Sequence, residues 1–286
     1  MNNLRRIIII FFTFFLLLLR GGMAASGGSP PPLAETGIFR CERYESYYEG
    51  YEGHEGAEGD ERAAYAAQLE YVFALLQGQN PAGFQAGFAT AASRARHHAA
   101  RPALGVLLPC GRLTPDTAVL STAALGHPAL AAGIGFVAAE KIADYLDSPD
   151  AVKKRVAAMV PVVEVFAYGD LRPRSLRLQA AIAANLYLAH FLAGNPVAVP
   201  AAVKPDAVTA RLSRDGTIIA AGKGREVDGG QWAMALWVIN TAVAAGWTID
   251  PGDIIVTGSL AETDGLPPGS YEADFGPLGH LYMRVD

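Results

Sequence analysis

The sequence has few of the features that identify common classes of protein. It contains only two cysteines, and charged residues make up 18% of its 286 positions, with a net charge of −5. Its nearest approach to a basic patch is SRARHHAAR, residues 93–101, a short cluster that is typical of a solvated helix face. The chain also lacks a CxxC pair, a Ser-His-Asp nucleophile elbow and the glycine signatures of dinucleotide and P-loop sites. We therefore expect no nucleic-acid partner.

The first 26 residues have the composition of a secretory signal peptide. A basic start, MNNLRR, precedes an uncharged apolar run of thirteen residues, Ile7–Leu19, and small residues follow. This run is shorter than the roughly 20 residues that a helix needs to span a bilayer. We expect residues 1–26 to be a signal peptide and the protein to be exported, either periplasmic or secreted. Two alternatives stay open: an uncleaved membrane anchor, or a true start at Met23 and a cytoplasmic protein.

The composition of residues 27–60 predicts a disordered, acidic, glycine-rich linker. SGGSPPP at its start cannot hold a helix, and GYEGHEGAEGDE, residues 50–61, consists of four Gly-x-Glu triplets. Cys41 lies in this linker and could pair with Cys110 in an oxidising compartment. Two cysteines so far apart also arise by chance, so their pairing is left open.

The rest of the chain predicts an α+β protein. Apolar residues recur at three- and four-residue steps after Glu61, which predicts a helix that ends near Gly78, and we assign residues 61–103 to a helical N-terminal region. In residues 104–286 short apolar runs alternate with Gly and Pro turns, which is typical of a mixed, β-rich domain. Hydrophobic residues make up 51% of the chain, enough to bury a sizeable core.

Eight strands and two further helices are expected in this domain. The strands are 104–108, 130–138, 160–167, 187–192, 208–213, 217–221, 253–258 and 280–285. The helices are Asp150 to Met159 and residues 230–245, and Asp215-Gly216 is expected to form the turn of a hairpin. The strand at 253–258 is expected to end at Thr257-Gly258-Ser259. Small polar residues there either form an ordinary turn or offer backbone and hydroxyl groups to a ligand.

Several segments, and the order in which they follow one another, are similar to those of a known family. They are VPVVEVF (160–166), AAIAAN (180–185), LSRDGTIIAAGKGREV (212–227), WVINTAVAAGWTIDPGDIIVTGSL (237–260), PPGSYEADF (267–275) and the closing stretch 277–285. With these motifs the chain resembles the fumarylacetoacetate hydrolase-like family, in the branch of 2-keto-4-pentenoate hydratase and oxalocrotonate decarboxylase. The resemblance covers residues 100–286, and residues 61–100 more loosely.

The resemblance implies a lyase or hydrolase reaction on a 2-oxo acid or β-diketo acid, assisted by Mg²⁺ or Mn²⁺. Such cations prefer oxygen ligands, which the relatives supply from a Glu-x-Glu pair on one strand and a third acid further along. Glu164 matches the third acid. A gapless placement puts the pair on Ala131 and Gly133, so both carboxylates are absent. Using Glu140 instead would require a deletion before Glu164, so we prefer the gapless placement.

The resemblance also implies a set of site residues. Thr257, Gly258 and Ser259 are expected at the substrate pocket, with Lys223 and Asn185 as further ligand-binding candidates. The segment that carries a lysine in the relatives corresponds to Ala86–His98, which has none.

Glu164 has two interpretations, since an unpaired carboxylate in an apolar strand is costly. It is either a remnant metal ligand or a structural acid that pairs with an arginine or caps a backbone turn. The candidate arginines are Arg172, Arg174 and Arg177.

Two functions are compatible with these observations. The first is an exported hydratase/decarboxylase-like protein with a degenerate metal site and no tightly bound cofactor, a non-catalytic protein that binds a small carboxylate or acts as a structural subunit. The alternative is an active carbon–oxygen or carbon–carbon lyase that uses Mg²⁺ or Mn²⁺ to hydrate or decarboxylate an unsaturated 2-oxo acid. The missing acids favour the first. In both cases we expect a small carboxylate ligand and a homo-oligomer or a hetero-complex with a family subunit. Glutamates at positions 131 and 133 should then create or strengthen metal binding.

Overall fold

The computed structural model describes residues 61–115, 118–123, 125–169, 178–199 and 203–286. Three sets of residues with earlier predictions lie outside these ranges: the expected signal peptide (1–26), the expected linker (27–60) with Cys41, and the candidate arginines at 172, 174 and 177. The structure does not test the predictions made for them. In the described ranges, no helix has the length and apolar character needed to cross a membrane.

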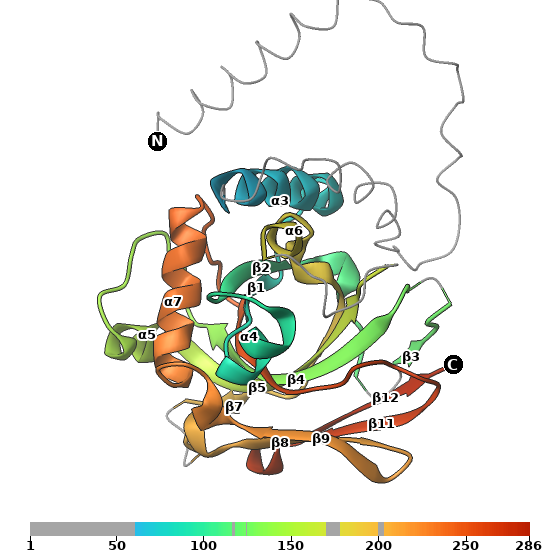
Figure 1. Ribbon diagram of the computed structural model, residues 1–286. Helices are drawn as coiled ribbons and strands as arrows, with labels where there is room; N and C mark the ends of the chain where they lie inside the picture. The colour runs from blue at the N-terminus through green and yellow to red at the C-terminus, as the bar shows by residue number, and fades with distance from the viewer. Residues whose placement is uncertain (1–60, 116–117, 124, 170–177, 200–202) are drawn as a thin grey trace, which may run out of the picture. The chain divides into compact units, whose positions relative to one another are not determined.

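The centre of the structure is a mixed sheet of seven strands (Figure 1). Its order is β2-β1-β10-β4-β5-β6, and β7 pairs with β5. All neighbours are antiparallel except β1 and β10, which are parallel. The strands are β1 Gly83–Gly87, β2 Ala103–Leu107, β4 Pro128–Ala138, β5 Val156–Ala167, β6 Leu188–Ala193, β7 Val197–Ala198 and β10 Ile254–Glu262.

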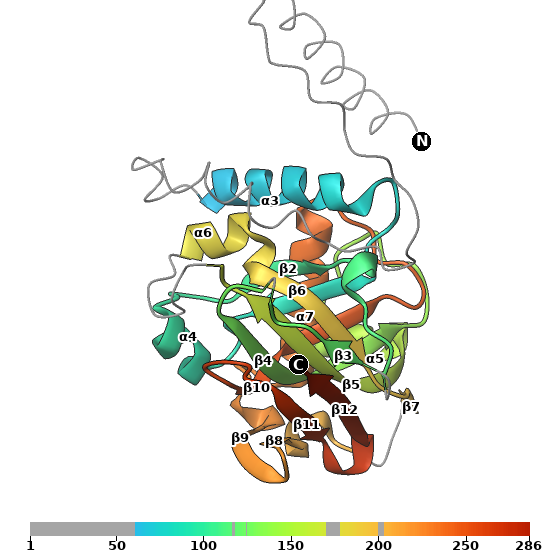
Figure 2. The same cartoon turned by 90° about the vertical axis from the view of Figure 1, so that its right-hand side faces the viewer.

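A second sheet of five strands packs below the first in Figures 1 and 2. Its order is β3-β12-β11-β8-β9, and side chains from both sheets share one large apolar cluster. Asp215 and Gly216 form the expected hairpin turn between β8 and β9, both with positive φ. The strands are β3 Val119–Leu120, β8 Thr209–Arg214, β9 Thr217–Lys223, β11 Gly269–Asp274 and β12 His280–Val285.

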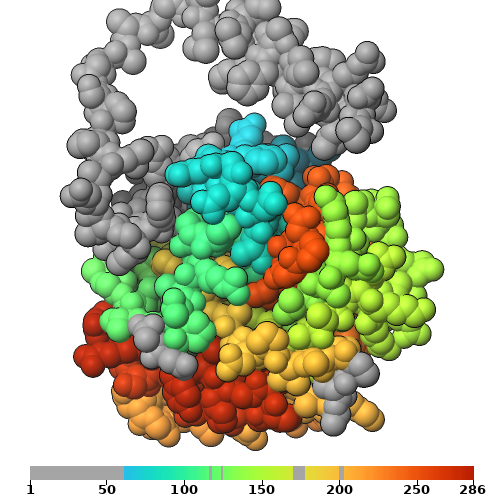
Figure 3. Space-filling view, turned by 180° about the vertical axis from the view of Figure 1, so that it is seen from behind, coloured from blue at the N-terminus to red at the C-terminus, as the bar shows by residue number. Residues whose placement is uncertain are grey.

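Helices cover the first sheet. They are α3 Glu61–Leu76, α4 Ala91–His97, α5 Pro149–Arg155, α6 Leu178–Ala183 and α7 Gln231–Ala244, with short 3-10 turns at Pro109–Gly111, Asn185–Tyr187, Pro205–Ala207, Gly224–Glu226 and Gly276–Leu278. Helix α7 packs on β1 and β10 and against α5, and α3 packs on α6. The view from behind shows α7 (orange) beside the yellow-green segment that contains α5 (Figure 3).

The expected α+β class is confirmed, and each of the eight expected strands is present with ends that move by a few residues. Four strands were not expected: β1, β3, β7 and β11. Of these, β1 lies in the region 61–103 that was assigned to helices, where it pairs with β2 and β10. Its sequence GFQAG has a glycine at each end and no β-branched residue, so local propensity does not mark it as a strand.

The helix expected from Asp150 to Met159 is wrong in its second half. Helix α5 ends at Arg155, and Val156 already has extended backbone angles. From there the chain is strand β5, whose Val156 pairs with Ala138 of β4. The valine-rich run after Arg155 prefers a strand, and pairing with the long strand β4 on one side settles the choice.

The strand β10 does not end at Thr257–Ser259, contrary to the prediction. It continues to Glu262, because Ser259 pairs with Gly133 and Glu262 pairs with Ala131. The register shifts on both sides of Ser259, which marks a β-bulge. Gly258 has a φ of 103°, and a Cβ at this position would collide with the side chain of Ala89. The glycine is therefore required by the bulge and by close packing.

A left-handed turn precedes β6. Asn185, Leu186 and Tyr187 have consecutive φ angles of 48°, 58° and 60°, a conformation that costs about 1–2 kcal/mol for each residue other than glycine. The buried amide of Asn185 holds this turn to the edge strand β2. Its oxygen accepts from the N–H of Val106 at 2.7 Å and its nitrogen donates to the carbonyl of Val106 at 2.8 Å. The Asn185 side chain thus makes the two hydrogen bonds with Val106 that a neighbouring strand would otherwise make at this edge.

Replacing Asn185 by alanine should destabilise the protein strongly. The change removes two buried hydrogen bonds and leaves both polar groups of Val106 without a partner, so we expect a loss of about 2–4 kcal/mol in the free energy of unfolding. Urea unfolding measures it. Asn240→Ala is the matched control, since its amide makes the same two bonds with Leu146, at 2.9 Å each, in a partly exposed place. An equal loss in both variants would contradict a special role for Asn185.

Candidate functional site

A pocket opens between α4, the last residues of β10 and the left-handed turn before β6. It contains about 540 Å³ of empty space, counting the part that is open to solvent. The residues that line it are Gly87, Phe88, Ser93, Arg96, His97, Ala129, Leu130, Ala131, Phe166, Tyr168, Leu186, Tyr187, Ser259, Glu262, Thr263 and Asp264. Most of the wall is apolar, and the polar groups gather at α4 and at the end of β10.

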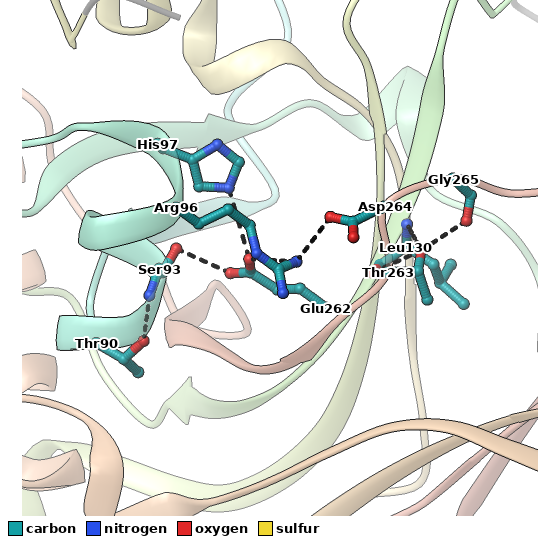
Figure 4. Close-up of polar contacts among 9 residues, drawn as sticks. All are labelled: Thr90, Ser93, Arg96, His97, Leu130, Glu262, Thr263, Asp264 and Gly265. Atoms are coloured by element: carbon teal, nitrogen blue, oxygen red, sulfur yellow. Dashed lines mark hydrogen bonds and ion pairs between the residues drawn. The ribbon is translucent and has the colours of Figure 1, made fainter. Parts of the chain in front are cut away.

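Helix α4 presents three polar side chains to this pocket. Ser93, Arg96 and His97 are spaced by three and four residues, so they share one face of the helix. The helix begins at Thr90, whose hydroxyl accepts from the N–H of Ser93 at 3.0 Å, and it ends at His98 in the left-handed conformation. Figure 4 shows Ser93, Arg96 and His97 directed toward Glu262 at the end of β10.

Glu262 is the centre of this polar cluster. Its carboxylate accepts a hydrogen bond from the Ser93 hydroxyl at 2.9 Å, and it lies 3.5 Å from His97 Nε2 and 3.6 Å from Arg96 Nη1. Burial by itself raises the pKa of the Glu262 carboxyl. The hydrogen bonds from His97 and Ser93, with the charges of His97 and Arg96, outweigh that effect and hold the pKa below its usual range. Glu262 is therefore ionised at neutral pH.

Glu164 lies on the same face of the sheet in a very different environment. It is fully buried in β5, and neither carboxyl oxygen has a hydrogen-bond partner in the part of the chain that the structure describes. Burial raises the pKa of Glu164 to about 8, and the negative charge of Glu262 adds to the rise. This carboxyl group is therefore neutral at pH 7.

One residue separates the two glutamates. Ala131 of β4 pairs with Glu164 on one side and with Glu262 on the other, so the three side chains form a row across the sheet. Residues paired across neighbouring strands point to the same face. Ala131 lines the pocket, as does Phe166, which follows Glu164 by two residues and shares its face.

These donors do not fit a tightly held Mg²⁺ or Mn²⁺. Among the residues that the structure describes, no group of three or more His, Cys, Asp or Glu side chains could hold a metal ion. Position 131 supplies a methyl group, and Glu262 already faces a hydroxyl group and two basic side chains. Metal binding requires deprotonated ligands, and Mg²⁺ gives up its water reluctantly.

Of the five residues that the sequence predicted at a ligand site, the structure places one, Ser259, in the pocket lining. Ser259 lines the pocket, whereas Thr257 is fully buried and its hydroxyl is hydrogen-bonded to the carbonyl of Ile134, at 3.0 Å, and to the side chain of Gln231. Gly258 is part of the β-bulge, and the side-chain amide of Asn185 is hydrogen-bonded to the backbone of Val106. Lys223 lies exposed at the end of β9, away from the pocket lining, with its N–H donated to Glu226. Their roles in ligand binding stay predictions.

The residues of the polar cluster around Glu262 were not predicted from the sequence: Ser93, Arg96, His97 and Glu262 itself. Residues 93–101 were interpreted as a solvated helix face, and the segment Ala86–His98 was noted for its missing lysine. The structure corrects the first interpretation, because Arg96 and His97 face the pocket. Glu262 follows Thr257–Ser259 by three residues, beyond the expected end of the strand. Continuing the period-two alternation past the glycine would have placed it on a strand.

Comparisons with solved structures identify the fold. No model of a known protein family matches the chain. The structure is similar to 4-oxalocrotonate decarboxylase from Pseudomonas putida G7 in complex with magnesium and adipate, with a TM-score of 0.70 and 20% identity over 80% of this chain and 87% of that one. The complex of the same decarboxylase with calcium and acetate gives a TM-score of 0.71, again with 20% identity over 80% of this chain and 87% of that one.

Two more distant structures agree. A fumarylacetoacetate hydrolase family protein from Yersinia pestis CO92 has a TM-score of 0.55 and 13% identity over 71% of this chain and 91% of its own. The 2-hydroxyhepta-2,4-diene-1,7-dioate isomerase from Mycobacterium marinum has a TM-score of 0.52 and 14% identity over 71% and 73% of the two chains. The chain therefore has the fumarylacetoacetate hydrolase-like fold, as its motifs implied.

Replacing Glu164 by glutamine should change how stability depends on pH. The folded pKa is about 8, compared with 4.5 for an exposed carboxyl. Below pH 4.5 the group is protonated in both the folded and the unfolded state, so its titration does not change stability there. The wild type loses stability as pH rises from about 4.5 toward 8. Between pH 5 and 8 we expect the free energy of unfolding of the wild type to fall relative to Glu164→Gln by about 4 kcal/mol.

Urea unfolding at a series of pH values measures this difference. The control is Glu140→Gln, because Glu140 is exposed and paired with Arg155. A difference between wild type and Glu164→Gln that stays constant with pH would show that Glu164 titrates as an ordinary carboxyl.

Proposed function

We propose that this protein uses its pocket to bind a small carboxylate of the 2-oxo acid class without a tightly held divalent cation, and that it is a non-catalytic member of its fold class. One observation carries the proposal. In the row Glu164–Ala131–Glu262 the central residue, Ala131, has no oxygen that could bind a cation. Glu164 on one side is protonated, and the carboxylate of Glu262 on the other side is already hydrogen-bonded.

The chemistry of the pocket supports an anionic ligand. Ser93, Arg96, His97 and Ser259 bring hydroxyl, guanidinium and imidazole groups to a mostly apolar cavity, beside the acids Glu262 and Asp264. The basic and hydroxyl groups are donors of the kind that bind a small organic acid. The complexes of the similar decarboxylase contain adipate and acetate, both of which are carboxylates. The same complexes contain magnesium or calcium, which is where this chain is proposed to differ.

Calorimetric titration tests the proposal, with pyruvate as the simplest 2-oxo acid. We expect the wild type to bind pyruvate equally well with and without EDTA, and to show no submillimolar binding of Mn²⁺. Ala131→Glu is the informative variant. It places a third carboxylate between Glu164 and Glu262, and we expect it to gain Mn²⁺ binding. Tight Mn²⁺ binding by the wild type would contradict the proposal.

Only position 131 is suitable for this test. A Cβ at Gly133 would lie 2.5 Å from the carbonyl oxygen of Gly258, so a glutamate at 133 would force the backbone apart. The pair of replacements that the sequence suggested is therefore reduced to one. Ala129→Glu is a useful control, since this position also lines the pocket but pairs with Phe166 instead of Glu164.

The second candidate function is an active lyase that hydrates or decarboxylates an unsaturated 2-oxo acid with added Mg²⁺ or Mn²⁺. The likeness to 4-oxalocrotonate decarboxylase over 80% of the chain favours it, together with the position of Glu164 beside the pocket. Loss of the ultraviolet absorbance of a dienol substrate, followed with either metal present, distinguishes the two. Turnover that Glu164→Gln abolishes would establish the lyase.

Export and assembly belong to the proposal as well. The basic start and apolar run of residues 1–26 support a cleaved signal, and the intact mass of protein recovered from the producing cell measures it. A mature chain that begins after residue 26 is expected, whereas a chain that retains Met1 would favour an anchor. The exposed Ile218 and Ile219 on the edge strand β9 support contact with a second copy or a family subunit.

A further inference from the structure

The three polar groups of α4 are the best anion receptors in the pocket, and a side chain of the protein itself occupies them. The Ser93 hydroxyl donates to one oxygen of Glu262, while His97 Nε2 and Arg96 Nη1 lie within 3.6 Å of the other. A hydroxyl group, an imidazole and a guanidinium that converge on one carboxylate are what a site for a ligand carboxylate would contain.

The pocket wall includes both sides of this contact. Arg96, His97 and Glu262 each line the cavity, and their side chains are 38%, 7% and 18% exposed. A ligand that enters the cavity therefore meets Glu262 and its partners together. Arg96 also lies 3.4 Å from Asp264, whose side chain is 75% exposed and screened by solvent.

Helix α4 has further contacts that hold it in place besides this one. Thr90 caps its first turn, and Arg94 donates to the carbonyl of Phe88 at 3.1 Å and pairs with Asp228 at 2.6 Å. The backbone N–H of Asp228 in turn donates to the carbonyl of Ala89 at 3.0 Å. The backbone of α4 is therefore held by contacts that do not involve Glu262.

We propose that Ser93, Arg96 and His97 form the subsite for the carboxylate of the ligand, and that Glu262 is an internal competitor that fills this subsite until a ligand displaces it. The inference rests on the proposed carboxylate-binding function and adds to it. It names the residues that recognise the carboxylate, and it assigns to Glu262 a role in limiting affinity. A ligand carboxylate within 4 Å of an ionised Glu262 would be repelled, so binding requires the Glu262 carboxylate to turn away.

Glu262→Gln tests the inference. Glutamine has the same shape and can still accept from Ser93, but it carries no charge. We expect pyruvate to bind Glu262→Gln at least about tenfold more tightly than the wild type, because the competing charge is gone. Glu140→Gln changes the net charge by the same amount at an exposed position and should leave the affinity unchanged. Arg96→Gln should weaken binding in both the wild type and the Glu262→Gln background.

The outcomes distinguish the inference from the proposed function. Wild-type binding that Glu262→Gln leaves unchanged or weakens would overturn the inference alone. The absence of pyruvate binding in both proteins would overturn both. Binding by Glu262→Gln alone would support the inference.

A measurement on the wild type avoids reliance on the variant's folding. Pyruvate should shift the imidazole resonances of His97 in an NMR titration and leave those of the distant His280 in place. Binding without any shift at His97 would also overturn the inference.

Discussion

The pairing of β4 with β5 on one side and β10 on the other is the constraint on which the site depends. This register places Glu164, Ala131 and Glu262 in one row on the pocket face of the sheet. A slip of one residue in either pair would turn a glutamate to the opposite face. The length of the β4–β5 ladder, from Pro128 to Ala138, makes such a slip costly. The bulge at Ser259 sets the second register and carries β10 as far as Glu262.

The two glutamates share a row but differ in charge because their surroundings differ. Glu164 sits among apolar side chains, where desolvation favours the protonated form. Glu262 is also largely buried, yet Ser93, Arg96 and His97 reach it from α4 and favour the ionised form. Pairs of acids whose environments separate their pKa values are typical of functional sites.

Much of the fold could be predicted from local patterns. The runs that became β4, β5, β8, β9 and β12 are apolar or β-branched and bounded by Gly and Pro turns, so each was recognised with small errors at the ends. Strand β1 was missed because GFQAG is short, has a glycine at each end and no β-branched residue, so its pairing with β2 and β10 makes it a strand. Helix α5 was extended too far because Ala157, Ala158 and Met159 suit a helix locally, whereas the valines around them and the pairing with β4 make the segment a strand. For Thr257–Ser259, a glycine was interpreted as a strand end when it marks a bulge.

The sequence by itself determined the α+β class, most of the strands, the family of folds that the chain resembles and the absence of glutamates at positions 131 and 133. These depend on residue type and short-range spacing, which can be read along the chain. Only the tertiary structure decided that Glu164 is buried without a hydrogen-bond partner among the described residues, that Glu262 lies across Ala131 from it, and that α4 turns three polar groups toward Glu262. Those relations join positions as far apart as Ser93 and Glu262. Strand register and helix placement set them, and both depend on packing of the whole core.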